Sequence, residues 1–216
     1  MTNLFSTFDP CTGSLSMNWM SMTIFMLMTP MNFWLMNNKN TMIMKKLTMS
    51  MYNEMKMLMK MKGSTIMMMS MLTFIMMNNI MGLMPYIFTA SSHMMFSLSL
   101  ALPTWTSLMI YGWMNKTNEM LKHLIPMGTP AMLIPFMVII ETISNLIRPG
   151  SLAVRLSANM IAGHLLMVLL GNNSSSMLMM SMTMIIIMML ITFETAVSMI
   201  QSYVFMTLST LYSSEI

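Results

Sequence analysis

The sequence Arg148-Pro-Gly-Ser-Leu-Ala-Val-Arg155-Leu-Ser-Ala-Asn159-Met-Ile-Ala-Gly163-His164-Leu-Leu places Arg155 deep inside an apolar stretch that runs from Ala131 to Leu170. A guanidinium keeps its positive charge at any accessible pH. At the centre of a bilayer that charge costs about 2.5–3.5 kcal/mol on insertion scales. No Asp or Glu lies within one helical turn of Arg155 to neutralise it. We therefore expect its counter-charge to come from another protein.

The composition is that of an integral membrane protein. Of the 216 residues, 56% are hydrophobic and only 7% are charged, whereas soluble domains carry about 25% charged residues. Apolar runs long enough to span a bilayer, about 20 residues each, recur along most of the chain. The 43 methionines are spread through all of these runs, so we interpret them as apolar filler and not as a copper site. The single cysteine, Cys11, allows no internal disulfide and no pair of metal ligands.

We expect one all-α membrane domain over residues 1–216, with about three conventional transmembrane helices followed by a hairpin of two long tilted helices. The conventional spans are predicted at Leu15–Met36, Ser64–Met84 and Met94–Met114. The hairpin is predicted at Ala131–Leu170 and Met177–Tyr212, with the polar turn 171–176 between them. A continuous helix over the last stretch would reach roughly 54 Å, against a hydrocarbon core of about 30 Å. Each long stretch must therefore contain a break or be steeply tilted, and Pro149-Gly150 offers a bend in the first.

Between the first two spans, the segment Met42–Lys62 is amphipathic. At 100° per residue, one arc of roughly 100° collects its polar residues Lys45, Lys46, Asn53, Lys56 and Lys60. The opposite side carries the apolar residues Met44, Leu47, Met51 and Leu58. This pattern favours a helix that lies in the membrane interface with its lysines toward anionic headgroups. Docking against a soluble partner is the alternative.

The distribution of lysines predicts the orientation of the chain. Between the first and second spans lie Lys39, Lys45, Lys46, Lys56, Lys60 and Lys62, and between the third span and the hairpin lie Lys116 and Lys122. The N-terminal tail and the loop Pro85–His93 contain no Lys or Arg. The positive-inside rule then puts the N-terminus outside and, after five crossings, the C-terminus inside.

Apart from tyrosines, the hairpin contains five ionisable residues: Glu141, Arg148, Arg155, His164 and Glu194. Ionisable residues at membrane depth are functional candidates by default, because each must be compensated or must line water. Arg148 precedes Pro149-Gly150, where its side chain can reach water, and we interpret it as structural. Glu141 lies seven residues earlier on the same helical stripe, so it either pairs with Arg148 or lines an aqueous entry path.

Three polar residues extend this pattern. Asn159 shares a helix face with Arg155, so its amide can orient the guanidinium. His164 falls roughly on the other side of that helix and is expected in a different aqueous cavity, where it passes protons or only bonds across helices. Glu194 suits a group that takes and releases protons. Gln201 faces the same way as Glu194 and either lines the same polar face or only bridges two helices.

The residues around Arg155 resemble the signature of subunit a of the F-type ATP synthase in its mitochondrial form. The resemblance covers nearly the whole chain and rests on residues 153–166 together with Asn3–Pro10, Asn79–Pro85, Pro126–Pro130, Ile140–Asn145 and Ile200–Phe205. The methionine excess also resembles that of proteins encoded in invertebrate mitochondrial genomes.

This resemblance implies a stator channel in the mitochondrial inner membrane, beside a rotating ring of c subunits and in contact with other Fo and peripheral stalk subunits. It implies that the N-terminus faces the intermembrane space and the C-terminus the matrix. It also implies a role for each polar residue. Arg155 would face the ring carboxylate, His164 and Glu194 would serve the half-channel open to the intermembrane space, Glu141 would serve the matrix half-channel, Asn159 and Gln201 would flank the arginine, and Glu215 would lie near the matrix exit.

Two other functions are compatible with the residues alone. A secondary transporter could use Arg155 to bind an anionic substrate, although such transporters often show two related halves and no internal repeat is visible here. A non-catalytic membrane subunit of a respiratory complex would use the polar residues only to hold helices together. The sequence contains no nucleotide-binding loop, metal-ligand pair or nucleophile triad, so we expect no bond chemistry by this chain alone, no cofactor and no nucleic acid partner.

Overall fold

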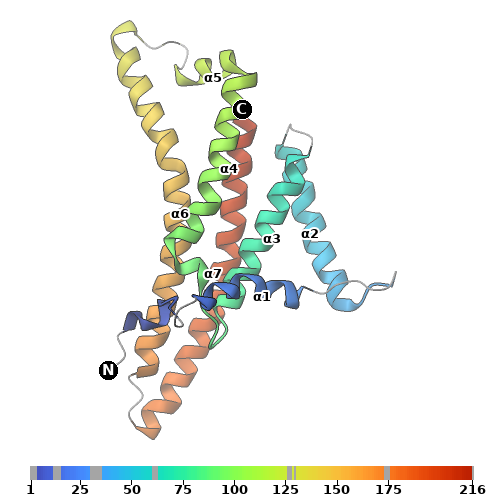
Figure 1. Cartoon of the computed structure of the whole chain (residues 1–216), viewed down its shortest axis with the longest axis vertical. Coiled ribbons are helices and arrows are strands. Elements are labelled where there is room, and N and C mark those ends of the chain that lie inside the picture. The colour runs from blue at the N-terminus through green and yellow to red at the C-terminus, as the bar shows by residue number, and fades with distance from the viewer. Residues whose placement is uncertain are drawn as a thin grey trace.

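The computed structural model describes residues 4–11, 16–29, 36–59, 63–125, 128, 130–172 and 176–215. Within these ranges all regular structure is helical, and several helices are apolar enough to cross a membrane, which confirms the predicted all-α membrane fold. Figure 1 shows long helices gathered into a bundle, with α2 splayed to one side of it.

Among the residues that the structure describes, four helices have the length and apolar composition of membrane spans. They are α3 (Ser64–Gly82), α4 (Met94–Asn115), α6 (Ile134–Asn172) and α7 (Met177–Glu215). The shorter α-helices are α1 (Ser21–Met28), α2 (Lys39–Leu58) and α5 (Thr117–Leu124). Four 3-10 turns complete the described structure: η1 (Leu4–Phe8), η2 (Met17–Met20), η3 (Ala90–Ser92) and η4 (Ala131–Leu133).

The first predicted span, 15–36, is described only in part. Turn η2 and helix α1 cover residues 17–28, while residues 15 and 30–35 lie outside the described residues, as do Lys60 and Lys62 of the basic segment. Helix α1 has eight residues, fewer than the about 20 that a crossing needs. It packs against α3, where the rings of Phe25 and Phe74 lie 5.2 Å apart. The crossing at 15–36 therefore stays a prediction.

The two long stretches each form one unbroken helix. Helices α6 and α7 both have 39 residues, which corresponds to roughly 58 Å at 1.5 Å per residue. Pro149 lies inside α6 without ending it, because membrane helices tolerate proline where neighbouring groups satisfy the freed carbonyl. Of the two possibilities that the sequence left open, the structure has continuous helices. Figure 1 shows them close together in their lower halves and separated toward the upper end, where α4 and α5 lie.

The core of the bundle joins all four spanning helices. Its buried residues are Ile75, Ala101, Leu152, Ala153, Leu156 and Phe205. Lipid is as apolar as these side chains, so the helices are held together by close packing and not by exclusion of water. The small side chains of Ala101 and Ala153 let the backbones of α4 and α6 approach closely.

Helix α2 docks on its own chain through a methionine-rich cluster. Met55 and Met59, at its C-terminal end, pack with residues of α3 and α7 in a cluster that consists of Met55, Met59, Met68, Leu72 and Met206. The Tyr203 hydroxyl of α7 also donates a hydrogen bond to the Glu54 carboxylate of α2 at 3.2 Å. Lys45, Lys46 and Lys56 are exposed, as the amphipathic pattern predicts. Leu47 and Leu58, which that pattern assigned to the apolar face, are exposed as well.

The side of α7 that packs against the bundle carries most of its buried polar side chains, together with the apolar Phe205 and Met206, whereas its outward side is mostly apolar. Its buried residues include Glu194, Ser198, Gln201, Ser202, Ser209, Thr210 and Ser213. The hydroxyls of this set donate hydrogen bonds to carbonyls three residues earlier in the same helix, at 2.7–2.8 Å. Because these groups are satisfied locally, they can be buried at low cost and their small size brings α7 close to its neighbours. This face carries Glu194 and Gln201 toward α6.

Candidate functional site

Arg155 lies on the exposed face of α6. Its neighbours on that face, Ser151, Ala158 and Ala162, are small and also exposed. Within the described residues no carboxylate lies within ion-pair distance of the guanidinium, since the salt bridges there involve other groups. The positive charge of Arg155 is thus presented outward, on a surface of small side chains that a neighbouring helix could approach closely.

Arg148 is held by its own chain instead. Its guanidinium lies 4.0 Å from the Glu141 carboxylate, so the ion pair that the sequence allowed is present. The same guanidinium lies over the Tyr212 ring of α7, 4.8 Å from the ring centroid, in cation–π geometry. Both contacts come from residues of the hairpin, and they fix Arg148 between α6 and the end of α7.

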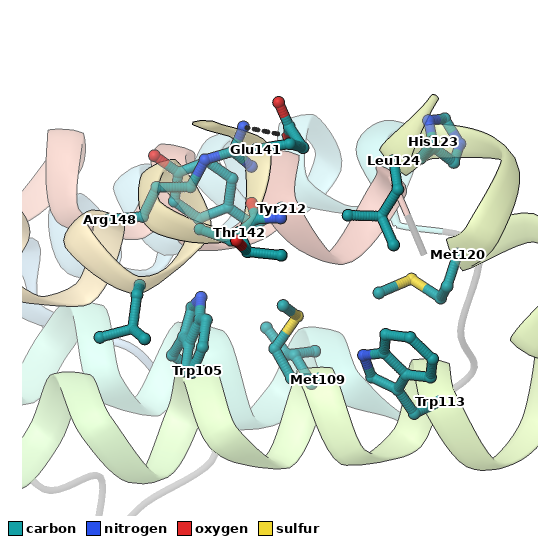
Figure 2. Close-up of a pocket in the computed structure, with 13 residues that line it drawn as sticks. Trp105, Met109, Trp113, Met120, His123, Leu124, Glu141, Thr142, Arg148 and Tyr212 are labelled. Atoms are coloured by element: carbon teal, nitrogen blue, oxygen red, sulfur yellow. Dashed lines mark ion pairs between the residues drawn. The ribbon is translucent and has the colours of Figure 1, made fainter. Parts of the chain in front are cut away.

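Glu141 and Arg148 line a cavity of about 320 Å³, which we call the inner cavity. Figure 2 shows Trp105, Met109 and Trp113 of α4 along one wall, the ion pair on the opposite wall and His123 of α5 at one end. A carboxylate, a guanidinium and an imidazole in one cavity make it a polar space within an apolar bundle. It can hold water beside Glu141.

The structure brings Asn159 and Gln201 together. The Asn159 amide donates a hydrogen bond to the Gln201 side-chain oxygen at 3.1 Å, which links α6 to α7. Gln201 is buried, and Asn159 lies one helical turn beyond Arg155. Sequence reasoning placed each of them near the arginine, but it did not predict that they bond to one another.

Glu194 lies against Gly163 of α6. The carboxylate is buried, and a Cβ added at position 163 would overlap the Glu194 carboxyl group. With glycine at this position the carboxylate can lie directly against the surface of α6, whereas a larger residue would force the end of the Glu194 side chain to shift. Gly163 directly precedes His164, so the close contact brings the acid of α7 to the part of α6 that carries the histidine.

His164 lines a second and larger space of about 600 Å³, which we call the outer cavity. Its walls come from the N-terminal segment, from the loop after α3 and from α6 and α7. The backbone of Gly82 lies within hydrogen-bonding reach of the imidazole. The ring of Phe8 meets it edge-on at 6.3 Å. Its Nε2 atom is buried and has no hydrogen-bond partner within the described part of the chain.

Several other buried polar atoms near this end of α3 also have no partner among the described residues. They are the two amide atoms of Asn79, the Ser91 hydroxyl and Nε2 of His93. Buried polar groups normally find a partner, and water supplies it where protein does not. Sequence reasoning did not assign these three residues to the site. The adjacent pair Asn78-Asn79 in an otherwise apolar run was the signal that could have found Asn79.

Arg155 lies between the two cavities along α6. It is seven residues from Arg148 and nine from His164, which corresponds to roughly 10 Å and 13 Å along the helix axis. Arg155 is not among the residues that line either cavity. Glu215 is the last residue of α7, and the position of its side chain is outside the described structure. In the described ranges, no three His, Cys, Asp or Glu side chains come together to hold a metal ion.

The sequence of the whole chain is similar to known proteins. The family model of the ATP synthase A chain matches residues 15–214. The chain is 52% identical to ATP synthase subunit a of Drosophila yakuba over 222 residues, and 53% identical to the proteins of that name from Locusta migratoria over 223 residues and Aedes albopictus over 224 residues. Each alignment covers 100% of this chain and 99% of the relative.

Proposed function

The chain belongs to the ATP synthase A chain family, and we propose that it is the stator of the proton path, with Arg155 as the barrier between two half-channels. One observation carries the proposal. Arg155 is exposed on α6, has no ion-pair partner among the described residues, and lies between two polar cavities. As a member of this family the chain is a proton-translocating Fo subunit, a multi-pass protein of the mitochondrial inner membrane.

The partner of Arg155 in this proposal is a carboxylate carried by a ring of c subunits. An isolated ionised carboxylate is prohibitively costly in lipid, so the ring carboxylate must be protonated while it faces the membrane. Opposite Arg155 the nearby positive charge stabilises the ionised form, and the proton can leave. Arg155 cannot release its own proton, so it blocks direct transfer between the half-channels. The exposed small residues beside it leave room for the ring helices.

The two cavities supply the two access routes. A proton enters from the intermembrane space through the outer cavity and passes His164 and the buried Glu194 to reach the ring. After the ring has turned, it leaves through the inner cavity beside Glu141 and reaches the matrix near Glu215. Moving one charge through the membrane potential yields about 2.3 kcal/mol per 100 mV, and this free energy drives the rotation.

In this scheme Asn159 and Gln201 form a hydrogen-bonded polar pair beside Arg155. Their hydrogen bond spans the two long helices one turn from Arg155. It fixes the distance between α6 and α7 at the level where the ring carboxylate would pass. The other Fo and peripheral stalk subunits are then expected on surfaces away from this face, because a static subunit there would block the ring.

The decisive experiment replaces Arg155 by Ala in the assembled complex. We expect assembly on native gels and ATP hydrolysis by the soluble sector to persist, while ATP-driven proton pumping is abolished because the ring carboxylate has lost its counter-charge. Robust coupled pumping by an assembled Arg155→Ala complex would refute the proposed role. A transporter or a purely structural subunit would show no specific loss of rotary coupling.

The orientation is tested by Cys11, the single cysteine of the chain, which is exposed. We propose that the N-terminus faces the intermembrane space, since the basic loops mark the matrix side. A membrane-impermeant maleimide should then label Cys11 in mitoplasts with an intact inner membrane. The hydrogen bond to Asp9 and the charge of that carboxylate raise the pKa of the Cys11 thiol, so the labelling needs mildly alkaline pH. Labelling only after the inner membrane is permeabilised would reverse the assignment.

A further inference from the structure

The N-terminal segment forms one wall of the outer cavity. Turn η1 brings Phe8 against His164 of α6, with the two rings edge-on and 6.3 Å between centroids. Four consecutive residues, 6–9, line the cavity. A segment that precedes the first predicted span is therefore part of the space in which the histidine lies, although nothing in its own sequence pattern connects it to α6.

Asp9 is held at the mouth of this cavity by local hydrogen bonds. The backbone N–H of Cys11 donates to the Asp9 carboxylate at 3.0 Å, and the side-chain amide of Asn18 donates to the Asp9 backbone carbonyl at 3.3 Å. Asp9 is exposed, while the next residue toward the histidine, Phe8, is half-buried. The carboxylate thus keeps contact with water and still lines the cavity.

The other titratable groups at this end differ from Asp9 in depth or charge. Tyr86 and His164 line the same cavity, His93 is packed between Trp19 and Phe88, and Glu194 is buried behind Gly163. Among the described lining residues, Asp9 is the one carboxylate, and none is Lys or Arg. The mouth of the outer cavity is therefore anionic, and an anionic concave surface concentrates cations.

We propose that Asp9 is the proton-collecting residue of the outer half-channel and that Phe8 is a positioning residue that holds it over His164. This inference rests on the proposed function. Asp9 takes a proton from bulk water on its carboxylate. That O–H bond then breaks as the proton passes through the cavity to Nε2 of His164, the buried atom without a partner in the described structure. Asp9 returns to its anionic form and can collect again.

The test uses the assembled complex reconstituted in vesicles, with the pH on the outer-cavity side varied at a constant proton-motive force. Asp9→Asn should lower the rate of ATP synthesis roughly two- to ten-fold at alkaline pH on that side, because a collecting charge raises the local supply of protons. At acid pH on that side the rate should equal the wild-type rate, since proton supply no longer limits it. Asp9→Glu should keep the wild-type profile.

The matched control is Glu119→Gln, which removes an exposed acid at the other end of the molecule, where it pairs with Lys116 at 3.9 Å. It should leave the rate unchanged at every pH on the outer-cavity side. Phe8→Ala should reproduce the pH-dependent loss of Asp9→Asn, and Phe8→Leu should restore the wild-type profile because it keeps an apolar side chain against His164. A wild-type profile for Asp9→Asn, or a loss of equal size at all pH values, overturns the inference.

Arg155→Ala in the same vesicles separates this inference from the proposed function. If Arg155→Ala retains coupled pumping, the half-channel scheme fails and the role of Asp9 fails with it. If Arg155→Ala abolishes pumping while Asp9→Asn keeps the wild-type profile, the half-channel scheme stands and the collecting role of Asp9 alone is wrong.

Discussion

Two arginines on one helix, seven residues apart, meet opposite surroundings. Arg148 has a carboxylate at 4.0 Å and an aromatic ring at 4.8 Å, both from its own chain. Arg155 is exposed among small side chains and has no carboxylate within ion-pair distance in the described residues. One guanidinium therefore makes contacts within its own chain, while the other is left to pair with a group from another protein.

This difference shows why charge alone does not identify a functional residue in a membrane protein. Each arginine is costly in lipid, so each must be compensated. Compensation by the same chain gives a fixed structure that needs nothing further. A charge that its own chain does not compensate must be paired by a group of another protein. Such pairing can form and break as that partner moves. Arg155 therefore suits a rotary motor, and Arg148 suits a scaffold.

The largest expected difference between the two arginine sites comes from replacing each arginine by lysine. Arg155→Lys should nearly abolish ATP-driven proton pumping, because an ammonium group can lose its proton in an apolar membrane environment and lacks the planar fork of a guanidinium. Arg148→Lys should keep most of the activity, because an ammonium group can still pair with Glu141 and lie over Tyr212. Pumping in membrane vesicles, normalised to assembled complex, measures both. Equal tolerance of lysine at the two positions would contradict the different roles assigned to Arg148 and Arg155 and would favour a non-catalytic role for the polar residues.

A second large effect concerns Glu194, the buried acid of α7 that lies against Gly163. In Gly163→Ala the new Cβ would overlap the Glu194 carboxyl, so α7 or its carboxylate must move. Overpacking costs about 1–3 kcal/mol, which corresponds to a roughly five- to 150-fold slower reaction if the cost falls on proton transfer. Gly150→Ala is the matched control on the same helix, because no atom lies within 4 Å of a Cβ added there. Similar rates of ATP synthesis for both variants would mean that the Glu194 carboxylate need not reach α6.

The sequence alone predicted the parts of this molecule that depend on local pattern. The apolar stretches and the polar turn at 171–176 predicted two long helices, because helix length and polarity are local properties. The lack of an acid near Arg155 in the sequence predicted an unneutralised charge, since side chains one turn apart are the first available partners. The seven-residue spacing of Glu141 and Arg148 likewise allowed their ion pair, which the structure contains.

Features that depend on how helices meet were not predictable in this way. The docking of α2 through Met55 and Met59 was missed, because methionine is spread along every face and does not mark the buried stripe. Nothing in the sequence around Gly163 shows that Glu194 faces it, since a helical pattern gives the direction of a side chain and not its neighbour. The return of Phe8 to His164 was missed for the same reason.

A smaller effect tests the ion pair between Glu141 and Arg148. Glu141→Gln and Arg148→Gln each remove one half of the ion pair, whose side chains are 40% and 30% exposed. Such pairs contribute about 0–1 kcal/mol, so we expect each single variant to lower ATP synthesis by no more than about five-fold through the loss of the pair. The double variant should lose less than the product of the two, because neither charge then lacks its partner. Effects that multiply would show that Glu141 serves the inner cavity without help from Arg148.

The smallest effect concerns the hydrogen bond beside Arg155. A double-mutant cycle with Asn159→Ala and Gln201→Ala should give a coupling energy of about 0.6 kcal/mol, the average for hydrogen bonds between membrane helices. Thermal unfolding of the assembled complex measures it. The pair Asn159→Ala and Ser209→Ala is the control, because Ser209 donates to the Met206 carbonyl of its own helix and its effect should add to that of Asn159 within about 0.5 kcal/mol. A coupling near zero for Asn159 and Gln201 would mean that packing alone sets the gap between α6 and α7. The two amides would then act on the ring carboxylate through their dipoles and not through the spacing of the helices.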